Sequence, residues 1–442
     1  MSLAPKLGLM NALMLVVGSV VGAGIFTTSG FLAAELPQGA AFVLVWIVGG
    51  ALTLAGALTY AEMGGMFPRA GGDYQFLKEA YGPWAGFVLG WLAFLVVNPG
   101  SIAALAIALA GYAGDVVPLG GAWGKTAFAL GTIAVLSAIN VRGVKWAGAA
   151  QDVMTIASIA LIAGLVALGL ASGKGDLSHF ATSDAPFSFR AFTGPAMIAV
   201  IFTYSGWFAS AYVASEVKRP ERNVPLSMFL GTLVVTVLYV ALNVFYLYAL
   251  PLSAMKGEPN VAARASALLL GPHVSLAVTV TILLAIATCV NGTILTGARV
   301  TYAMAEDGVF WPLFKRVHPR FRTPHLGIWA QGALSMLLVL LGTFEQILSY
   351  VVFVMLLTSA AAGVALVVLR VRRPGAPRPY RTFGYPVTPF VFVVSYAWIA
   401  ALVLLDKPAP SALGLVIAAS GVPVYLYWSR KKHAKSSKEM LP

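Results

Sequence analysis

The chain has 442 residues, of which 59% are hydrophobic and only 10% are charged. Soluble domains carry about 25% charged residues, so this composition excludes an ordinary soluble protein and indicates an integral membrane protein. The single cysteine excludes a disulfide framework, and the formal net charge of +13 raises the question of a nucleic-acid partner.

Long apolar segments follow one another along almost the whole chain. A membrane-spanning helix needs about 20 predominantly apolar residues, and nearly every run reaches that length. The first run is too long for a cleavable signal peptide and lacks an A-x-A cleavage site. We therefore predict an all-α integral membrane protein with twelve transmembrane helices, centred near Val21, Leu54, Ala103, Ile133, Ile159, Thr203, Val237, Ile286, Met336, Thr358, Ser395 and Ala418.

The basic residues are distributed unevenly over the connections between these segments. Both termini and the even-numbered connections carry 23 of the 29 Lys and Arg residues, and the odd-numbered connections carry the other six. The positive-inside rule then predicts a multi-pass protein of the cell (inner) membrane with both termini cytoplasmic. The topology of a membrane protein therefore explains the excess of basic residues. No nucleic-acid partner is expected.

The first apolar segment contains VVGSVVGAGIF, in which Gly18, Gly22 and Gly24 lie close together. Glycine costs about 1 kcal/mol in a helix relative to alanine, so this cluster needs a reason. Gly18 and Gly22 fit the small-xxx-small pattern of tightly packed membrane helices. The alternative is a helix that breaks at mid-membrane, where non-helical backbone is tolerated only if it is buried in protein or lines a cavity.

The sixth segment is interrupted in a similar way, by TYSG between Phe202 and Trp207. Transporters built from two five-helix inverted repeats place a broken helix first in each repeat, and the substrate lies between the two breaks. The N-terminus of a half-helix offers free N–H groups to a carboxylate, and unwound carbonyls hold a cation or an ammonium. The paired interruptions therefore favour ligand binding over simple packing.

This pattern divides the chain into four parts. We expect a first inverted repeat of helices 1–5 at residues 7–172 and a second of helices 6–10 at residues 190–373. Two accessory helices would follow at 384–429, and a basic cytoplasmic tail at 430–442. The polar composition of the tail predicts that it is unstructured.

Four motifs are specific in combination. They are VVGSVVGAGIF in the first helix, YAEMGGMFPRAGGDYQFLKEAYG at the end of the second, IFTYSGWFASAYVASEVKRPERNVP in the sixth and CVNGTILTGARVTYAMAEDG in the eighth. Together they resemble the amino acid–polyamine–organocation (APC) superfamily, specifically bacterial relatives of the L-type amino acid transporter (LAT) family. The resemblance covers the chain to about the tenth segment, and it implies a LeuT-type fold and amino acid transport by alternating access.

The same resemblance implies a substrate site at the two breaks. The N–H groups of the first break would bind the substrate carboxylate, and the carbonyls near Val20 and Phe202 its ammonium. Phe202 would also be the gating aromatic, while Ser205 stands where relatives often have Gly. The expected substrate-binding residues are Val20, Gly22, Ala23, Gly24, Phe202, Ser205 and Trp207.

The fifth helix departs from most of these relatives, which carry a Lys where this chain has Ser158. The position lies near the place where sodium-coupled members of the wider fold bind Na⁺. An ammonium about 4 Å from a cation repels it by about 4 kcal/mol at an effective dielectric of 20, and Ser158 removes that repulsion. We expect the carbonyls of Gly18 and Val21, with Ser158 and Thr288, to form an oxygen cage for Na⁺ as a coupling ion. The alternative is that Ser158 only fills space and the protein is an uncoupled exchanger.

We expect the substrates to be small or medium neutral L-amino acids, with cationic amino acids or polyamines as the alternative. A cationic side chain at mid-membrane would need a carboxylate. Glu62 and Glu216, at the cytoplasmic ends of their segments, are better explained as structural partners of basic residues, and Glu35 and Asp307 also lie at segment ends.

Other functions have less support in the sequence. No metal or cofactor is expected beyond the coupling ion, because the five histidines lie in predicted loops or the tail without metalloenzyme spacing. An enzyme is therefore not expected, nor a channel, since no filter-like loop repeats. Eukaryotic LAT members are often disulfide-linked to a heavy chain through a Cys after the third helix. This chain has only Cys289, in an apolar run, so no such partner is expected.

Overall fold

The structure, a computed structural model, describes residues 3–114, 116–183, 185–258, 260–342 and 344–439. These residues form helices and connecting loops, with two isolated β-bridges and no strand among them. Ten helical stretches within the described part of the chain are long and apolar enough to cross a membrane. The sixth and ninth expected segments correspond to shorter apolar helices, Phe189–Thr203 and His325–Leu341.

The first half of the chain supplies eight helices. Between α5 and α6 a π-helical turn, Ala93–Val97, joins the two into one continuous apolar stretch. The helices are α1 Leu9–Val20, α2 Gly24–Glu35, α3 Gly39–Met66, α4 Asp73–Tyr81, α5 Pro83–Leu92, α6 Asn98–Gly114, α7 Gly121–Val141 and α8 Val144–Ala171.

The second half begins with short helical pieces and ends with long helices. They are α9 Phe189–Ala191, the π-helical Phe192–Ala196, α10 Met197–Thr203, α11 Ala209–Tyr212, the 3-10 turn Ala214–Glu216, α12 Pro220–Ala249, α13 Leu252–Met255, α14 Val261–Leu270, α15 Ser275–Glu306, α16 His325–Leu341, α17 Phe344–Arg372, α18 Val387–Asp406 and α19 Pro408–Glu439. The expectation of an unstructured tail is wrong as far as Glu439, because α19 continues to that residue. The last three positions of the tail lie outside the described residues.

The core is built around α12, which packs against α3 and α1, and around α1, which also packs against α15. Small residues allow the close approach that membrane helices need: a Cβ built on Gly231 of α12 would lie 2.6 Å from Val16 of α1. Aromatic rings fill the space between α3, α12 and the sixth segment. The ring centroid of Tyr239 lies 5.7 Å from that of Trp46 and 5.0 Å from that of Tyr204.

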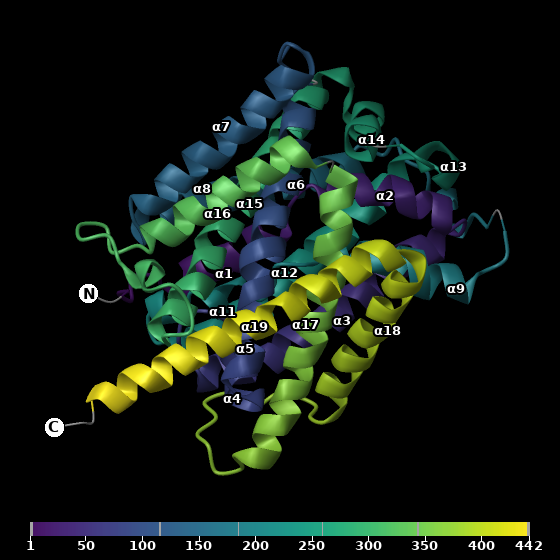
Figure 1. Cartoon of the computed structure of the whole chain (residues 1–442). Helices are drawn as coiled ribbons and strands as arrows, with labels where there is room; N and C mark the ends of the chain where they lie inside the picture. The colour runs from purple at the N-terminus through teal and green to yellow at the C-terminus, as the bar shows by residue number, and fades with distance from the viewer. Residues whose placement is uncertain (1–2, 115, 184, 259, 343, 440–442) are drawn as a thin grey trace.

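Figure 1 shows which elements lie at each side of the molecule. In the view of Figure 1 the C-terminal end of α19 lies at the left, away from α9, α13 and α14 at the right. The small helix α4 and the loop that joins α17 to α18 lie together at the bottom of that view.

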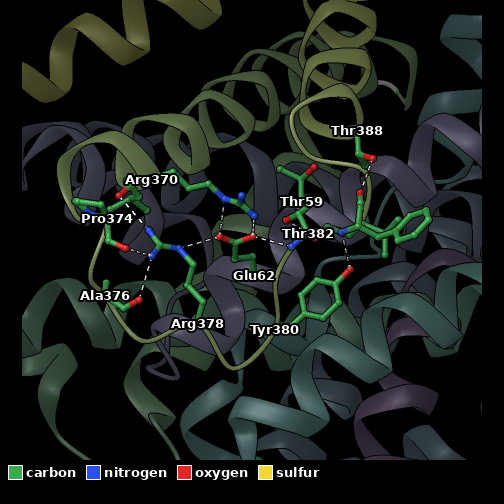
Figure 2. A network of polar contacts seen from close by, with 12 residues as sticks. Thr59, Glu62, Arg370, Pro374, Ala376, Arg378, Tyr380, Thr382 and Thr388 are labelled. Carbon is green, nitrogen blue, oxygen red and sulfur yellow. Dashed lines mark hydrogen bonds and ion pairs between the residues drawn. The ribbon is translucent and has the colours of Figure 1, made fainter.

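An ionic cluster links three elements at that lower end (Figure 2). The fully buried carboxylate of Glu62 on α3 accepts hydrogen bonds from Arg370 on α17 at 2.9 Å and from Arg378 at 3.1 Å. The backbone N–H of Thr382 donates to the same carboxylate at 2.7 Å. The prediction that Glu62 is a structural partner of basic residues is confirmed.

Glu216 has a corresponding role beside the sixth segment. Its carboxylate accepts from Nε of Arg299 on α15 at 2.7 Å, and both side chains are fully buried. Its backbone carbonyl accepts from the N–H groups of Lys6 and Leu7 at 2.8 and 2.9 Å. The N-terminal segment is thereby held against the end of the sixth segment, and the structural interpretation of Glu216 is also confirmed.

Candidate functional site

Both glycine-rich or polar segments singled out in the sequence are interrupted helices. α1 ends at Val20 and α2 begins at Gly24, which leaves residues 21–23 outside any helix. α10 ends at Thr203 and α11 begins at Ala209, which leaves a turn at residues 204–208. Each interruption frees backbone N–H and C=O groups that a continuous helix would have paired.

The two interruptions touch each other. Gly206 has a positive φ of 107°, and a Cβ built on it would lie 2.4 Å from the carbonyl oxygen of Ser19. A Cβ on Gly24 would lie 2.9 Å from Oγ1 of Thr203. Only glycine combines that backbone conformation with such a close approach, so Gly206 allows the second break to reach the first.

A tyrosine from α12 joins the carbonyls of the two breaks. The hydroxyl of Tyr239 donates to the carbonyl oxygen of Val20 at 2.8 Å and lies 3.3 Å from that of Thr203. A phenol has one proton, so it bonds one carbonyl at a time. Because Tyr239 is fully buried, this contact holds the two unwound segments at a fixed separation.

The N-terminus of α2 presents unpaired backbone donors. The N–H groups of Gly22, Ala23 and Gly24 have no hydrogen-bond acceptor among the residues that the structure describes. They stand at the positive end of a twelve-residue helix, where a carboxylate is stabilised by the N–H groups and the helix dipole together.

A cavity of about 760 Å³ lies between the breaks. Its volume falls within the roughly 300–1,000 Å³ typical of small-molecule sites. Residues from both breaks line it, together with residues of α6, α15 and α17. The expected site residues that line it are Val20, Gly22, Ala23, Gly24, Phe202 and Ser205.

The two carbonyls expected to bind an ammonium are already partly engaged. That of Val20 accepts from Tyr239, and that of Phe202 accepts from the N–H of Ser205 at 3.0 Å. A carbonyl oxygen has two lone pairs, so that of Val20 keeps one acceptor position, whereas that of Phe202 also receives the N–H of Tyr204. Phe202 itself is half-buried at the cavity wall, and its gating role stays a prediction.

Trp207 is not among the residues that line the cavity. Its side chain is 1% exposed and packs away from the breaks, with its ring centroid 4.7 Å from that of Tyr60 and 5.9 Å from that of Phe392. Trp207 therefore supports the turn from behind, within an aromatic cluster of α3 and α18.

The residues proposed for Na⁺ are only partly brought together. A Cβ built on Gly18 would lie 2.4 Å from Cγ2 of Thr288, so Thr288 faces Gly18 with its methyl group. The other nearest atoms to that position belong to Thr155 and Gln151, and Ser158 is not among them.

The hydroxyls of the proposed ion site bond within their own helices. Ser158 donates to the carbonyl of Met154 at 2.9 Å, and Thr288 donates to that of Leu284 at 2.6 Å. The lone pairs of both hydroxyl oxygens remain available. The N–H of Val21 donates to the carbonyl of Val17 at 2.9 Å, a bond that does not involve the Val21 carbonyl expected at the ion site. Na⁺ binding therefore stays a prediction.

Several cavity residues were missed by the sequence analysis. On α15, Cys289, Thr293 and Thr296 line the cavity, and their spacing of four and three residues marks one polar helix face. That spacing is a signal that the sequence contains. Asp73 and Tyr212 also line the cavity, but nothing in the sequence places α4 beside the sixth segment.

Comparison with known proteins identifies relatives of this chain. A family model described as "Amino acid permease" matches residues 7–422. The serine/threonine exchanger SteT of Bacillus subtilis (strain 168) is 33% identical over 437 residues, which cover 97% of this chain and 98% of that protein.

Mammalian proteins are also similar over nearly the whole chain. Large neutral amino acids transporter small subunit 2 of Homo sapiens is 28% identical over 443 residues, covering 97% of this chain and 82% of that protein. Asc-type amino acid transporter 1 of Homo sapiens is 27% identical over 442 residues, covering 97% and 84%. The resemblance inferred from the four motifs is confirmed, and the chain belongs to the amino acid permease family, as a relative of the L-type transporters in the APC superfamily.

Proposed function

We propose that this protein is a secondary transporter of small or medium neutral L-amino acids that works by alternating access. The observation that carries the proposal is the pair of touching helix breaks beside one cavity, with free N–H groups at the start of α2. The N–H groups of Gly22, Ala23 and Gly24 bind the substrate carboxylate. The Val20 and Phe202 carbonyls bind its ammonium, which every α-amino acid carries.

The proposed architecture has twelve membrane crossings in a LeuT-type arrangement. The ten long apolar stretches and two of the three shorter apolar helices, Phe189–Thr203 and His325–Leu341, support this count. The third, α14, has only ten residues and is too short to cross a bilayer. Residues 7–172 and 190–373 are the two inverted repeats, α18 and α19 are accessory, and both termini lie in the cytoplasm of the cell that carries the protein in its inner membrane.

Neutral substrates are favoured by the state of the buried acidic groups. Glu62 and Glu216 are neutralised by arginine partners, so neither offers an unpaired carboxylate to a cationic side chain. Asp73 lines the cavity without an arginine partner, but burial raises the pKa of its carboxyl to about 7, which disfavours the charged form that a cationic side chain would need. The names of the similar proteins refer to serine and threonine exchange and to large neutral amino acids, which fits the same class. The only cysteine, Cys289, is buried in the cavity wall, so a disulfide-linked heavy chain is not part of the proposal.

Reconstitution of the purified protein in liposomes tests the function. We expect saturable uptake of labelled L-alanine or L-serine that other neutral amino acids inhibit and arginine does not. Strong inhibition by arginine with none by neutral amino acids would instead establish a cationic substrate. Uptake that does not saturate would exclude a carrier.

The coupling ion is tested in the same liposomes. We propose that Na⁺ binds beside Gly18, Val21, Ser158 and Thr288, so an inward Na⁺ gradient should increase the initial rate of alanine uptake. Equal rates with Na⁺ and with choline would overturn the coupling. Uptake that then depended on amino acid inside the liposomes would identify an uncoupled exchanger.

A further inference from the structure

One buried carboxyl group faces the cavity without an ionic partner. Asp73 is the first residue of α4, between the apolar stretches of α3 and α5, and it lines the cavity together with Tyr212 of α11. It is only 4% exposed, and its Oδ1 has no hydrogen-bonding partner among the described residues. The other deeply buried carboxylates, Glu62 and Glu216, both have arginine partners.

The surroundings of Asp73 favour its neutral form. Burial raises the pKa of the carboxyl from 3.8 to about 7, although the hydroxyls of Tyr212 and Tyr60, which face it, act in the opposite direction. The charged groups on the elements packed against α4 are engaged elsewhere. Asp307, directly after α15, pairs with Lys78, and Arg373, directly after α17, pairs with Glu79, both on other parts of α4. Arg370 of α17 pairs with Glu62.

Asp73 is tied to the element that must move if the cavity is to open at this end. The preceding Gly71 donates its N–H to the carbonyl of Tyr212 at 3.0 Å. A Cβ built on Gly72, whose φ is +51°, would lie 2.4 Å from the Tyr212 ring. The turn before α4 therefore closes directly on α11, and separating the two would expose Asp73 to water.

We propose that Asp73 is a proton-binding site: its carboxylate takes a proton from water when the contact between α4 and α11 closes, and returns it to water when that contact opens. The proposal rests on the proposed transport by alternating access, in which such a contact opens and closes in each cycle. It assigns to this chain a coupling between proton binding and closure of one end of the cavity.

The direction of the pH effect follows from the two protonation states. In the closed arrangement the carboxyl titrates near neutrality, whereas a carboxyl in water has a pKa near 4. The closed arrangement therefore holds an extra proton between about pH 4 and pH 7, and its advantage over the open one falls as the pH rises through that window. Between pH 6 and pH 8 the protonated fraction falls from roughly 90% to roughly 10%.

Transport kinetics test the proposal in liposomes held at equal pH on both sides. Substrate that enters the cavity from the end opposite α4 and α11 is expected to need the α4–α11 contact closed. KM for uptake should then rise by up to about tenfold from pH 6 to pH 8, with a smaller change in kcat. Asp73→Asn should keep the low KM at both pH values, and Asp73→Glu should restore the dependence. Glu79→Gln, a carboxylate of the same helix outside the cavity, is the matched control and should behave like the wild type.

Infrared titration of the purified protein separates this proposal from the transport function. The wild type should show a protonated-carboxyl C=O band that disappears with a midpoint near pH 7, and Asp73→Asn should lack it. The absence of such a band, or the same pH-dependent KM in Asp73→Asn, would overturn the proton site. A titrating band in a protein that takes up no amino acid at any pH would leave the proton site intact and refute the proposed function.

Discussion

At the scale of single residues, Gly206 decides how closely the two helix breaks approach. Its φ of 107° disfavours any side chain, and its Cα faces the carbonyl oxygen of Ser19. We expect Gly206→Ala to destabilise the protein by about 1–3 kcal/mol from backbone strain, with a further cost from the contact with Ser19. Thermal unfolding in detergent should occur at lower temperature, and amino acid uptake should fall at least tenfold.

The matched control is Gly111→Ala in α6. A Cβ at Gly111 meets no atom within 4 Å, and alanine is the better helix former. Stability and uptake should be unchanged or slightly increased. Equal effects of the two substitutions would contradict the role assigned to Gly206.

Substitution of Tyr239 tests whether its hydrogen bond to the Val20 carbonyl matters for substrate binding. Tyr239→Phe removes the hydroxyl that donates to Val20 and leaves the ring in place. A hydrogen bond of this kind contributes about 0.5–1.5 kcal/mol, so we expect substrate affinity to fall by up to about tenfold. The measurement is the Kd for alanine, obtained from ligand-dependent thermal stabilisation of the purified protein.

The same helix offers the control. Tyr246 lies two helical turns further along α12, and its buried hydroxyl has no hydrogen-bonding partner among the described residues. Tyr246→Phe removes an equivalent oxygen and should leave the affinity unchanged. A similar loss in both variants would mean that the Tyr239 effect comes from packing.

At the scale of elements, the positions of the breaks could be predicted from the sequence. Glycines in the first segment and TYSG in the sixth marked them, because these residues are poor at sustaining an apolar helix. The structure leaves residues 21–23 and 204–208 outside helices, close to where the sequence indicated. Six of the seven expected substrate-binding residues line the cavity for the same reason.

The sequence could not predict what depends on side-chain direction or on distant packing. Trp207 follows Gly206 in a turn without helical periodicity, so its orientation toward Tyr60 could not be deduced from spacing. Asp73 lies in a connection about fifty residues beyond the first break. Its place at the cavity depends on how α4 folds back against α11, which no local pattern encodes.

The ion pair between Glu216 and Arg299 joins the end of the sixth segment to α15. Both side chains are fully buried, so Glu216→Gln leaves an uncompensated guanidinium, which typically costs about 3–5 kcal/mol. We expect a large decrease in thermal stability, and partial recovery in the double variant Glu216→Gln, Arg299→Met, because the buried charge is then gone. Thermal unfolding in detergent measures both.

An exposed pair provides the comparison. Glu258 lies 3.5 Å from Arg264, whose side chain is 52% exposed, and such surface pairs contribute about 0–1 kcal/mol. Glu258→Gln should therefore have little effect on unfolding. If Glu216→Gln were equally mild, the pair would not be what fixes the sixth segment to α15.

At the scale of the whole molecule, the distribution of basic residues predicts the orientation in the membrane. The side that carries 23 of the 29 Lys and Arg residues should be cytoplasmic, since translocating clustered positive charge is unfavourable. Green fluorescent protein fused to the C-terminus should fluoresce, and alkaline phosphatase fused there should be inactive. Alkaline phosphatase inserted after Gly173, in the exposed connection that follows α8, should be active. Activity at both positions would require an even number of crossings between them, whereas twelve crossings place seven between Gly173 and the C-terminus and so demand opposite results. Reversed results at both positions would keep that number and invert the orientation, which would move Asp73 and α4 to the outer face and reverse the side from which its proton is exchanged.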